Sequence, residues 1–265
     1  MSQLAQGKTQ LHYQIQGDGE PLVLIPGFSA GSWVWFQQVH GLSHNFQVIT
    51  FDSPGIGKSD FIERAAHMRF MADDVAALLQ DLKIERVHIL GASFGGFVAQ
   101  EFALAYPDMT RTLTLCCTSF GGPNHVAPSM DLLKALTSNN GFNTEDRIRR
   151  MLAPAFSKEF ARDCPNEVAR VVQERLANPV DERAYRWQLA AAVAFNAESR
   201  ICELQIPTLV ISGDADQIVP PQNSQNLAAK IPDAQLSLFQ GGSHLFFIER
   251  ADEFNSVVTE FLQRN

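Results

Sequence analysis

The chain has 265 residues, 45% of them hydrophobic, which is enough for one main domain with a substantial core. Its formal net charge of −8 leaves no basic patch, which argues against nucleic acid and anionic membrane surfaces as partners. The first residues contain no apolar run of signal-peptide length, and no stretch approaches about 18 uninterrupted apolar residues. We therefore predict a cytoplasmic protein without a membrane segment.

Short apolar runs bounded by turn residues predict buried parallel strands at residues 21–25, 47–51, 87–90, 113–116 and 208–212. Segments with a helical spacing of apolar residues, 71–82 and 97–106, lie between some of these runs. This alternation indicates an α/β fold, with a parallel sheet covered by helices on both faces. Residues 9–15 instead alternate polar and apolar, which predicts an antiparallel strand at the sheet edge.

The strand signals stop between residues 121 and 200, where charge-rich helical stretches replace them at 144–152, 166–176 and 182–195. We interpret 121–200 as a helical cap inserted into a core domain made of 1–120 and 201–265. The strand and helix pattern resumes after Ile206 and Pro207 and continues through residues 234–239 into a last helix at 252–262.

The four cysteines, Cys116, Cys117, Cys164 and Cys202, lack the paired spacings of a zinc site or a disulfide framework. We expect them to be buried packing residues, and we expect no metal site.

The sharpest motif is Gly91-Ala92-Ser93-Phe94-Gly95, which follows the strand at 87–90 and precedes a helix. A nucleophilic serine has to project above the sheet, and glycines two before and two after it relieve crowding at so sharp a turn. The following helix also directs free amides and its positive dipole end toward an anion at this place. The alternative is a glycine-rich turn with an incidental serine. The flanking elements favour Ser93 as a nucleophile.

A second turn of interest is Pro26-Gly27-Phe28, after the strand at 21–25. We predict that the backbone amides of Phe28 and Phe94 form an oxyanion hole, in which each donor contributes roughly 3 kcal/mol to transition-state stabilisation. Alone, Pro26-Gly27 would be an ordinary turn. Its place between a strand and the following aromatic segment favours the functional interpretation.

A serine hydroxyl needs a base within hydrogen-bond reach, and the base needs a third group to orient it. His244 fits best, because it lies in a glycine-rich loop between the last strand and the last helix, downstream of Ser93. Of the other histidines, His125 could line the pocket or lie on the surface. The remaining five have strand or surface contexts: His12, His40, His44, His67 and His88.

Two aspartates compete for the orienting role, since Gly213-Asp214-Ala215-Asp216 follows the strand at 208–212. Asp214 lies close to the strand end, where its carboxylate could cap the turn. Asp216 is the stronger candidate, because its later place in the turn lets it reach the loop on the neighbouring strand. The other position for such an acid, after the strand at 113–116, holds Thr118 and Ser119.

Taken together, these motifs resemble the α/β-hydrolase family over the whole chain outside the cap. The ordered matches are Pro26-Gly27-Phe28, residues 51–60, Gly91 to Gly95, Gly213 to Asp216 and Gly242-Ser243-His244. The resemblance implies a mostly parallel eight-stranded sheet, a helical cap after the sixth strand, and Ser93, Asp216 and His244 as catalytic triad. It also implies that the turn at 52–59 is structural. Pro26 departs from the histidine common there, but leaves the Phe28 amide in place.

Ser93 as nucleophile excludes the family branches that use aspartate, and the chain looks most like enol-lactonases and small carboxylesterases. We predict cleavage of a small, apolar ester or lactone through an acyl-enzyme, without a cofactor. The alternatives are a C–C bond hydrolase, a cofactor-free perhydrolase, or a signalling or binding protein of low turnover on the same scaffold. Candidate pocket residues are Trp33, His125, Trp187 and Phe195, although we favour cap packing for Trp187 and Phe195. The sequence indicates neither the natural substrate nor the oligomeric state.

Overall fold

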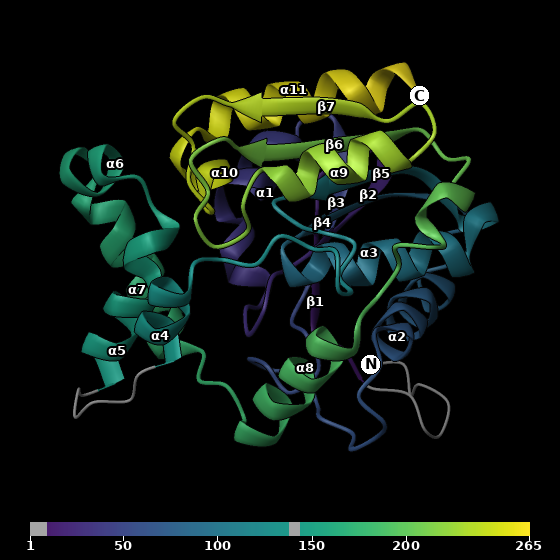
Figure 1. The fold of residues 1–265 in the computed structure, drawn as a ribbon. Coiled ribbons are helices and arrows are strands. Elements are labelled where there is room, and N and C mark those ends of the chain that lie inside the picture. Colours follow the sequence, from purple (N-terminus) through teal and green to yellow (C-terminus); the bar gives the residue numbers. More distant parts are fainter. Residues whose placement is uncertain (1–9, 138–143) are drawn as a thin grey trace.

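A mixed sheet forms the centre of the protein in the computed structural model, which describes residues 10–137 and 144–265 (Figure 1). Its seven strands follow the order β1-β3-β2-β4-β5-β6-β7, in which β1 is antiparallel to β3 and all other pairs are parallel. The strands are β1 (Tyr13–Gln16), β2 (Glu20–Ile25), β3 (Phe46–Phe51), β4 (Val87–Ala92), β5 (Thr110–Cys116), β6 (Thr208–Gly213) and β7 (Gln235–Phe239).

The α/β fold with its mostly parallel sheet is therefore confirmed, and the alternating segment at 9–15 overlaps the antiparallel edge strand β1. The count of eight strands is not met in the described part of the chain, and the helical insertion follows the fifth strand there, not the sixth. Each apolar or alternating run identified in the sequence overlaps one of these seven strands, so no run is left for an eighth strand. The eighth strand came only from the family resemblance.

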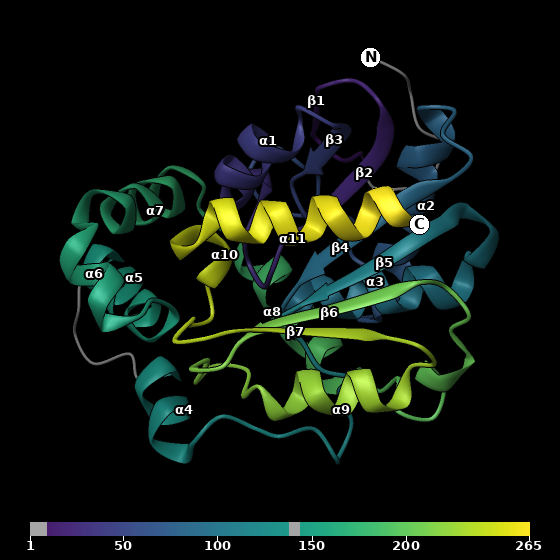
Figure 2. The same cartoon turned by 90° about the horizontal axis from the view of Figure 1, so that it is seen from above.

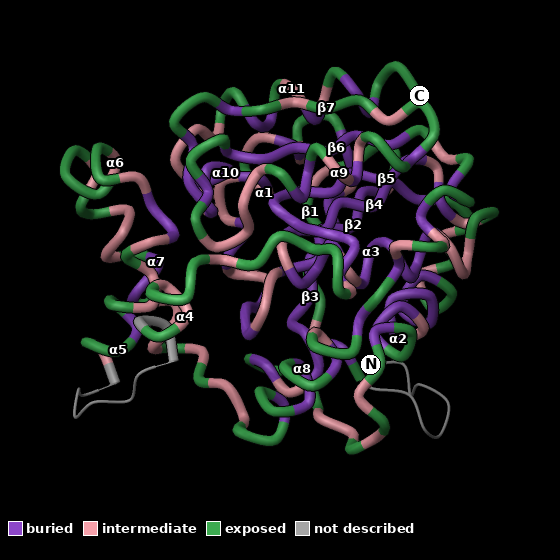
Figure 3. Tube along the Cα trace, in the orientation of Figure 1, coloured by how far each residue is buried: buried purple, intermediate pink, exposed green. Residues whose placement is uncertain are grey.

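Helices cover both faces of the sheet because alternate strand residues point to opposite sides. In β2, Val23 and Ile25 face one core, while Leu22 and Leu24 face the other. The first core is closed by α2 (Met68–Asp81), α3 (Phe94–Ala105) and α9 (Gln222–Lys230). The second is closed by α1 (Phe36–Leu42), α10 (Phe246–Glu249) and α11 (Ala251–Arg264) (Figure 2). The buried parts of the trace in Figure 3 follow these two cores.

We call the helical segment between β5 and β6 the cap. It contains α4 (Met130–Thr137), α5 (Thr144–Leu152), α6 (Lys158–Asp163), α7 (Pro165–Ala177) and α8 (Glu182–Ala194). Helices α5, α6 and α7 cluster at one side of the molecule, while α8 lies apart from them (Figures 1 and 2). Phe156 and Val171 of the cap join the second core, and Trp187 and Ala191 of α8 join the first. The domain limits at 121 and 200 stay a prediction.

None of the helices in the described residues is long and apolar enough to cross a membrane. The cytoplasmic location predicted from the sequence stays a prediction.

Candidate active site

Ser93 occupies a strained turn between β4 and α3. Its φ and ψ are 54° and −120°, a conformation that costs a non-glycine residue on the order of 1–3 kcal/mol. The surrounding backbone fixes the turn: the Ser93 N–H donates to the carbonyl of Cys116 at 2.8 Å, and the Thr118 hydroxyl donates to the Ser93 carbonyl at 2.7 Å. Ser93 therefore stands at the carboxyl end of β4, where a nucleophile of this fold belongs.

The glycines of the motif are required by space. A Cβ atom at Gly95 would lie 2.2 Å from the carbonyl oxygen of Ile25, and one at Gly91 would lie 2.3 Å from the carbonyl oxygen of Gly95. A side chain at Gly95 would push the start of α3 away from β2, and one at Gly91 would push it away from β4. The spacing of the motif thus follows from how closely the turn packs.

His244 and Asp216 form a buried pair at the carboxyl ends of β7 and β6. The His244 Nδ1 atom lies 2.7 Å from Asp216 Oδ2, and the two residues are only 8% and 3% exposed. The other carboxylate oxygen of Asp216 accepts hydrogen bonds from the amides of Ile218 and Val219, at 2.8 and 2.9 Å. The carboxylate is thus oriented before any substrate arrives.

Asp214 has a different role in the same turn. It is exposed, and its Oδ1 atom accepts a 2.7 Å hydrogen bond from the amide of Gly241. This contact joins the ends of β6 and β7, and so differs from the local turn cap that the sequence suggested for Asp214. Of the two aspartates, Asp216 is the one bonded to His244 in this geometry.

The electrostatics of the pair favour the imidazolium form of His244. Burial by itself would lower the pKa of His244, but the adjacent Asp216 and Cys117 together outweigh it and raise that pKa well above its usual range. An orienting carboxylate of this kind stabilises the imidazolium that forms when histidine takes a proton.

Cys117 is a member of this cluster that the sequence analysis did not single out. One ligand atom each from Cys117, Asp216 and His244 lie within 4.8 Å of one another, a set that could also hold a metal ion. Cys117 lies at φ 41° directly after β5 and is fully buried. Burial raises the pKa of its thiol well above the usual range. Cys117 directly follows β5, and the end of this strand is the second position that the sequence offers for an orienting acid. That position is the sequence signal that points to Cys117.

The predicted oxyanion loop packs against the Ser93 turn. A Cβ atom on Gly27 would lie 3.5 Å from the Cβ atom of Ser93, and the rings of Phe28 and Phe94 meet edge to face at 5.9 Å. Among the described residues, the Phe28 amide donates to no protein acceptor. Phe94 is the first residue of α3, so its amide has no partner inside the helix. Both amides are free to bind a ligand oxygen.

Helix α8 of the cap supports this loop. Gln188 Oε1 accepts a 2.8 Å hydrogen bond from the amide of Ser29, and Gln188 is fully buried. The ring of Tyr185 packs edge to face on Phe28 with 5.0 Å between centroids. The sequence analysis missed Gln188 and Tyr185. Their helical period showed which element they belong to, but not which distant loop they would contact.

Two of the predicted pocket residues mainly join the cap to the core. Trp187 donates from Nε1 to the carbonyls of Arg64 and Ala65, at 2.8 and 3.2 Å. Phe195 stacks on Phe97 with 4.4 Å between ring centroids. Both are buried in the first core, in agreement with the packing role favoured for them.

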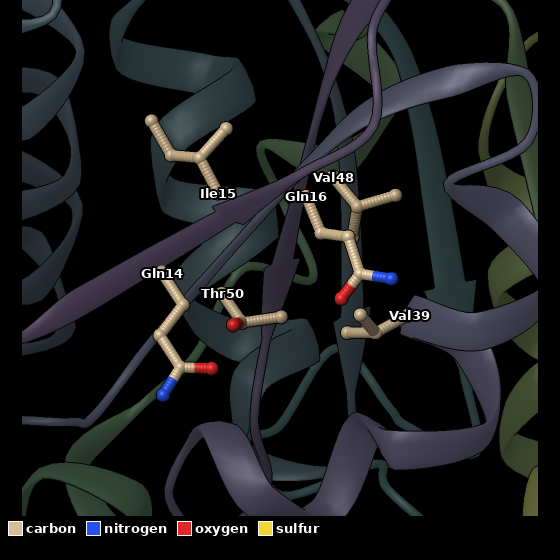
Figure 4. Close-up of a pocket in the computed structure, with 6 residues that line it drawn as sticks. All are labelled: Gln14, Ile15, Gln16, Val39, Val48 and Thr50. Carbon is tan, nitrogen blue, oxygen red and sulfur yellow. The ribbon is translucent and has the colours of Figure 1, made fainter.

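The other two predicted pocket residues lie elsewhere. His125 is exposed, and its Nδ1 atom contacts the carbonyl of Gly122 at 2.7 Å. Trp33 lines a cavity of about 390 Å³ that includes neither Ser93 nor His244. A neighbouring cavity of about 360 Å³, between β1, β3 and α1, is shown in Figure 4. Its lining residues are Gln14, Ile15, Gln16, Val39, Val48 and Thr50. Trp33 and His125 as pocket residues therefore stay a prediction.

Comparison with known proteins agrees with the architecture. Residues 20–251 match the family model described as the alpha/beta hydrolase fold. The chain is 33% identical to a 2-hydroxy-6-oxononadienedioate/2-hydroxy-6-oxononatrienedioate hydrolase of Cupriavidus pinatubonensis, over 96% of this chain and 90% of that protein. It is 30% identical to a poly(3-hydroxyalkanoate) depolymerase of Ectopseudomonas oleovorans, over 92% of this chain and 84% of that one.

Among solved structures, the enol-lactonase of Burkholderia xenovorans superposes with a TM-score of 0.83 at 27% identity, covering 96% of this chain and 97% of that one.

Proposed function

This chain belongs to the α/β-hydrolase family and is a hydrolase, and we propose that it is a carboxylic ester hydrolase with Ser93, His244 and Asp216 as its catalytic triad. The observation that carries the proposal is the buried 2.7 Å contact between His244 and Asp216, at the same edge of the sheet as the strained turn of Ser93. A serine, a histidine and a carboxylate in this chain order are the parts that acyl transfer requires.

The geometry supports a two-step reaction. The Ser93 hydroxyl attacks the carbonyl carbon of an ester or lactone while the free ring nitrogen of His244 takes its proton. Asp216 holds the other ring nitrogen and stabilises the imidazolium. The amides of Phe28 and Phe94 bind the oxyanion, and the imidazolium then protonates the leaving alcohol. Water, activated by His244, releases the acyl group and restores Ser93.

The aromatic rings of Phe28, Phe94 and Tyr185 favour a small substrate with an apolar group. The likeness to an enol-lactonase and to a poly(3-hydroxyalkanoate) depolymerase supports ester or lactone bonds as the target.

The test combines turnover with covalent labelling. Wild-type protein is assayed with short p-nitrophenyl esters and with a fluorophosphonate probe, beside Ser93→Ala and the matched control Ser199→Ala, which changes an exposed serine. We expect wild type and the control to turn over and to be labelled, and Ser93→Ala to do neither. If the wild-type protein neither hydrolyses short esters nor takes up the probe, the proposal fails.

Arg175 favours a second candidate function, the hydrolysis of a C–C bond in an anionic substrate. It lies on the face of α7 that also carries the buried Val171 and Val172, four and three residues earlier. Burial lowers the pKa of Arg175 to about 10. Tyr185, which packs on Phe28, acts in the opposite direction and raises this pKa. Within residues 10–137 and 144–265, no hydrogen bond or ion pair of this guanidinium is found.

A half-buried guanidinium for which the described residues offer no partner suits a substrate carboxylate. The hydrolase of Cupriavidus pinatubonensis named above acts, by its name, on a dioate. Ester and vinylogous diketone substrates, each with and without a carboxylate, separate the two functions. The C–C hydrolase candidate requires fast turnover of the anionic diketone and slow ester cleavage. Arg175→Ala should then raise KM for anionic substrates only, whereas Arg170→Ala, which removes a cation stacked on Phe36, should not.

A further inference from the structure

The loop that carries His244 is bound to the cap on both sides of the histidine. The Ser243 hydroxyl donates to the carbonyl of Pro154 at 3.1 Å, and the Leu245 amide donates to the carbonyl of Ala155 at 2.8 Å. Pro154 and Ala155 belong to the short 3-10 helix Ala153–Ala155, which follows α5. Two neighbours of the proposed base therefore depend on a segment that is about 90 residues away in sequence.

Glu249 completes this connection. It is the last residue of α10, and one carboxylate oxygen accepts a 2.5 Å hydrogen bond from the amide of Ser157, just before α6. The other oxygen lies 3.5 Å from the amide of Ser243, beside His244. Burial raises the pKa of Glu249, whereas these two amides act in the opposite direction. One carboxylate thus links the start of a cap helix to the loop of the base.

We propose that Glu249 is a positioning residue, which sets the ring of His244 by fastening its loop to the cap segment 154–157. The inference rests on the proposed role of His244. Glu249 touches neither the substrate nor the reacting atoms. It acts through Ser243, whose amide and hydroxyl are both held in place, and through the α10 turn that follows the histidine. Catalysis is sensitive to such support, because a misplacement of about 1 Å can cost on the order of 100-fold in rate.

Two substitutions remove the link from opposite ends. Glu249→Gln leaves one acceptor oxygen, whereas the carboxylate offers one oxygen to each of the Ser157 and Ser243 amides. Ser157→Pro removes the N–H that donates to Glu249 and fits the backbone, since Ser157 has φ −66° and Phe156 is extended at φ −112° and ψ 149°. The matched control is Ser157→Ala. It loses the hydroxyl, which caps Phe160 and also acts on Glu249, as the proline variant does, but it keeps the N–H, so the two variants differ in the backbone donor.

The readouts are kcat and KM for a p-nitrophenyl ester, and the low-field NMR resonance of the His244 Nδ1 proton shared with Asp216. We expect Glu249→Gln and Ser157→Pro to lower kcat about 10- to 100-fold with little change in KM, and to shift or broaden that resonance. Ser157→Ala should keep kcat and KM within a factor of about 3 of wild type and leave the resonance in place. Circular dichroism checks that each variant is folded.

The inference is overturned if folded Glu249→Gln keeps the wild-type kcat and resonance, or if Ser157→Pro behaves like Ser157→Ala. Failure of the proposed function gives a different result, since wild-type protein would then show neither ester turnover nor probe labelling.

Discussion

The choice between two aspartates shows how one residue decides the chemistry of a site. Asp216 and Asp214 lie in the same turn, yet one is buried against His244 and the other joins the ends of two strands at the surface. We predict that Asp216→Asn lowers kcat about 10⁴-fold, the order expected when a triad carboxylate is replaced. Asp214→Asn should lower it less than about tenfold, because only a turn contact is weakened. Ester turnover by the two purified variants checks this, and the opposite ranking would reassign the acid.

The raised pKa of His244 gives a pH dependence with a definite sign. The base is lost below its pKa, and the Asp216 carboxylate raises that pKa above its ordinary value of about 6.5. The acidic limb of kcat/KM should therefore lie above about pH 6.5 in wild type. Asp216→Asn removes the negative charge, so the limb should move to lower pH while the rate falls. Profiles for wild type, Asp216→Asn and Asp214→Asn test this, and a limb that stays unmoved in Asp216→Asn would contradict the pairing.

At the scale of elements, α8 supports the proposed oxyanion loop through the hydrogen bond between Gln188 and the Ser29 amide. Gln188→Leu keeps the volume but removes the acceptor, so we expect kcat to fall about tenfold with KM nearly unchanged. Trp187→Phe is the matched control on the same helix, because it removes bonds to Arg64 and Ala65 and leaves the loop untouched. Steady-state kinetics of both variants decide the point, and an equal loss in the two would show a general effect of α8.

The elements themselves were largely predictable, whereas their contacts were not. Buried strands appear as apolar runs and the nucleophile turn as a spaced pair of glycines, because both are dictated by neighbours in sequence. Gln188 and Ser29 are 159 residues apart, and Glu249 and Ser157 are 92 apart. No local pattern encodes such pairs. For the same reason Trp33 and His125 could be chosen by residue type but not placed.

At the scale of the whole molecule, the cap is part of both cores, through Phe156 and Val171 on one side and Trp187 and Ala191 on the other. We therefore predict that the cap and the sheet unfold in one transition. Trp187 is one of three tryptophans, so the difference in fluorescence between wild type and Trp187→Phe reports on the cap. This signal should be lost at the same urea concentration as the far-UV circular dichroism. An earlier loss would mean that the cap unfolds by itself.

The insertion of the cap between β5 and β6 also orders the appearance of the site during synthesis. Ser93 and the loop at Phe28 leave the ribosome first, then the whole cap, and only afterwards Asp216 and His244. A nascent chain that has just completed the cap therefore carries the proposed nucleophile without its proposed base. By the proposed mechanism, hydrolytic activity arises only after β6 and β7 have joined the sheet, so the growing polypeptide is inactive while its core is still incomplete.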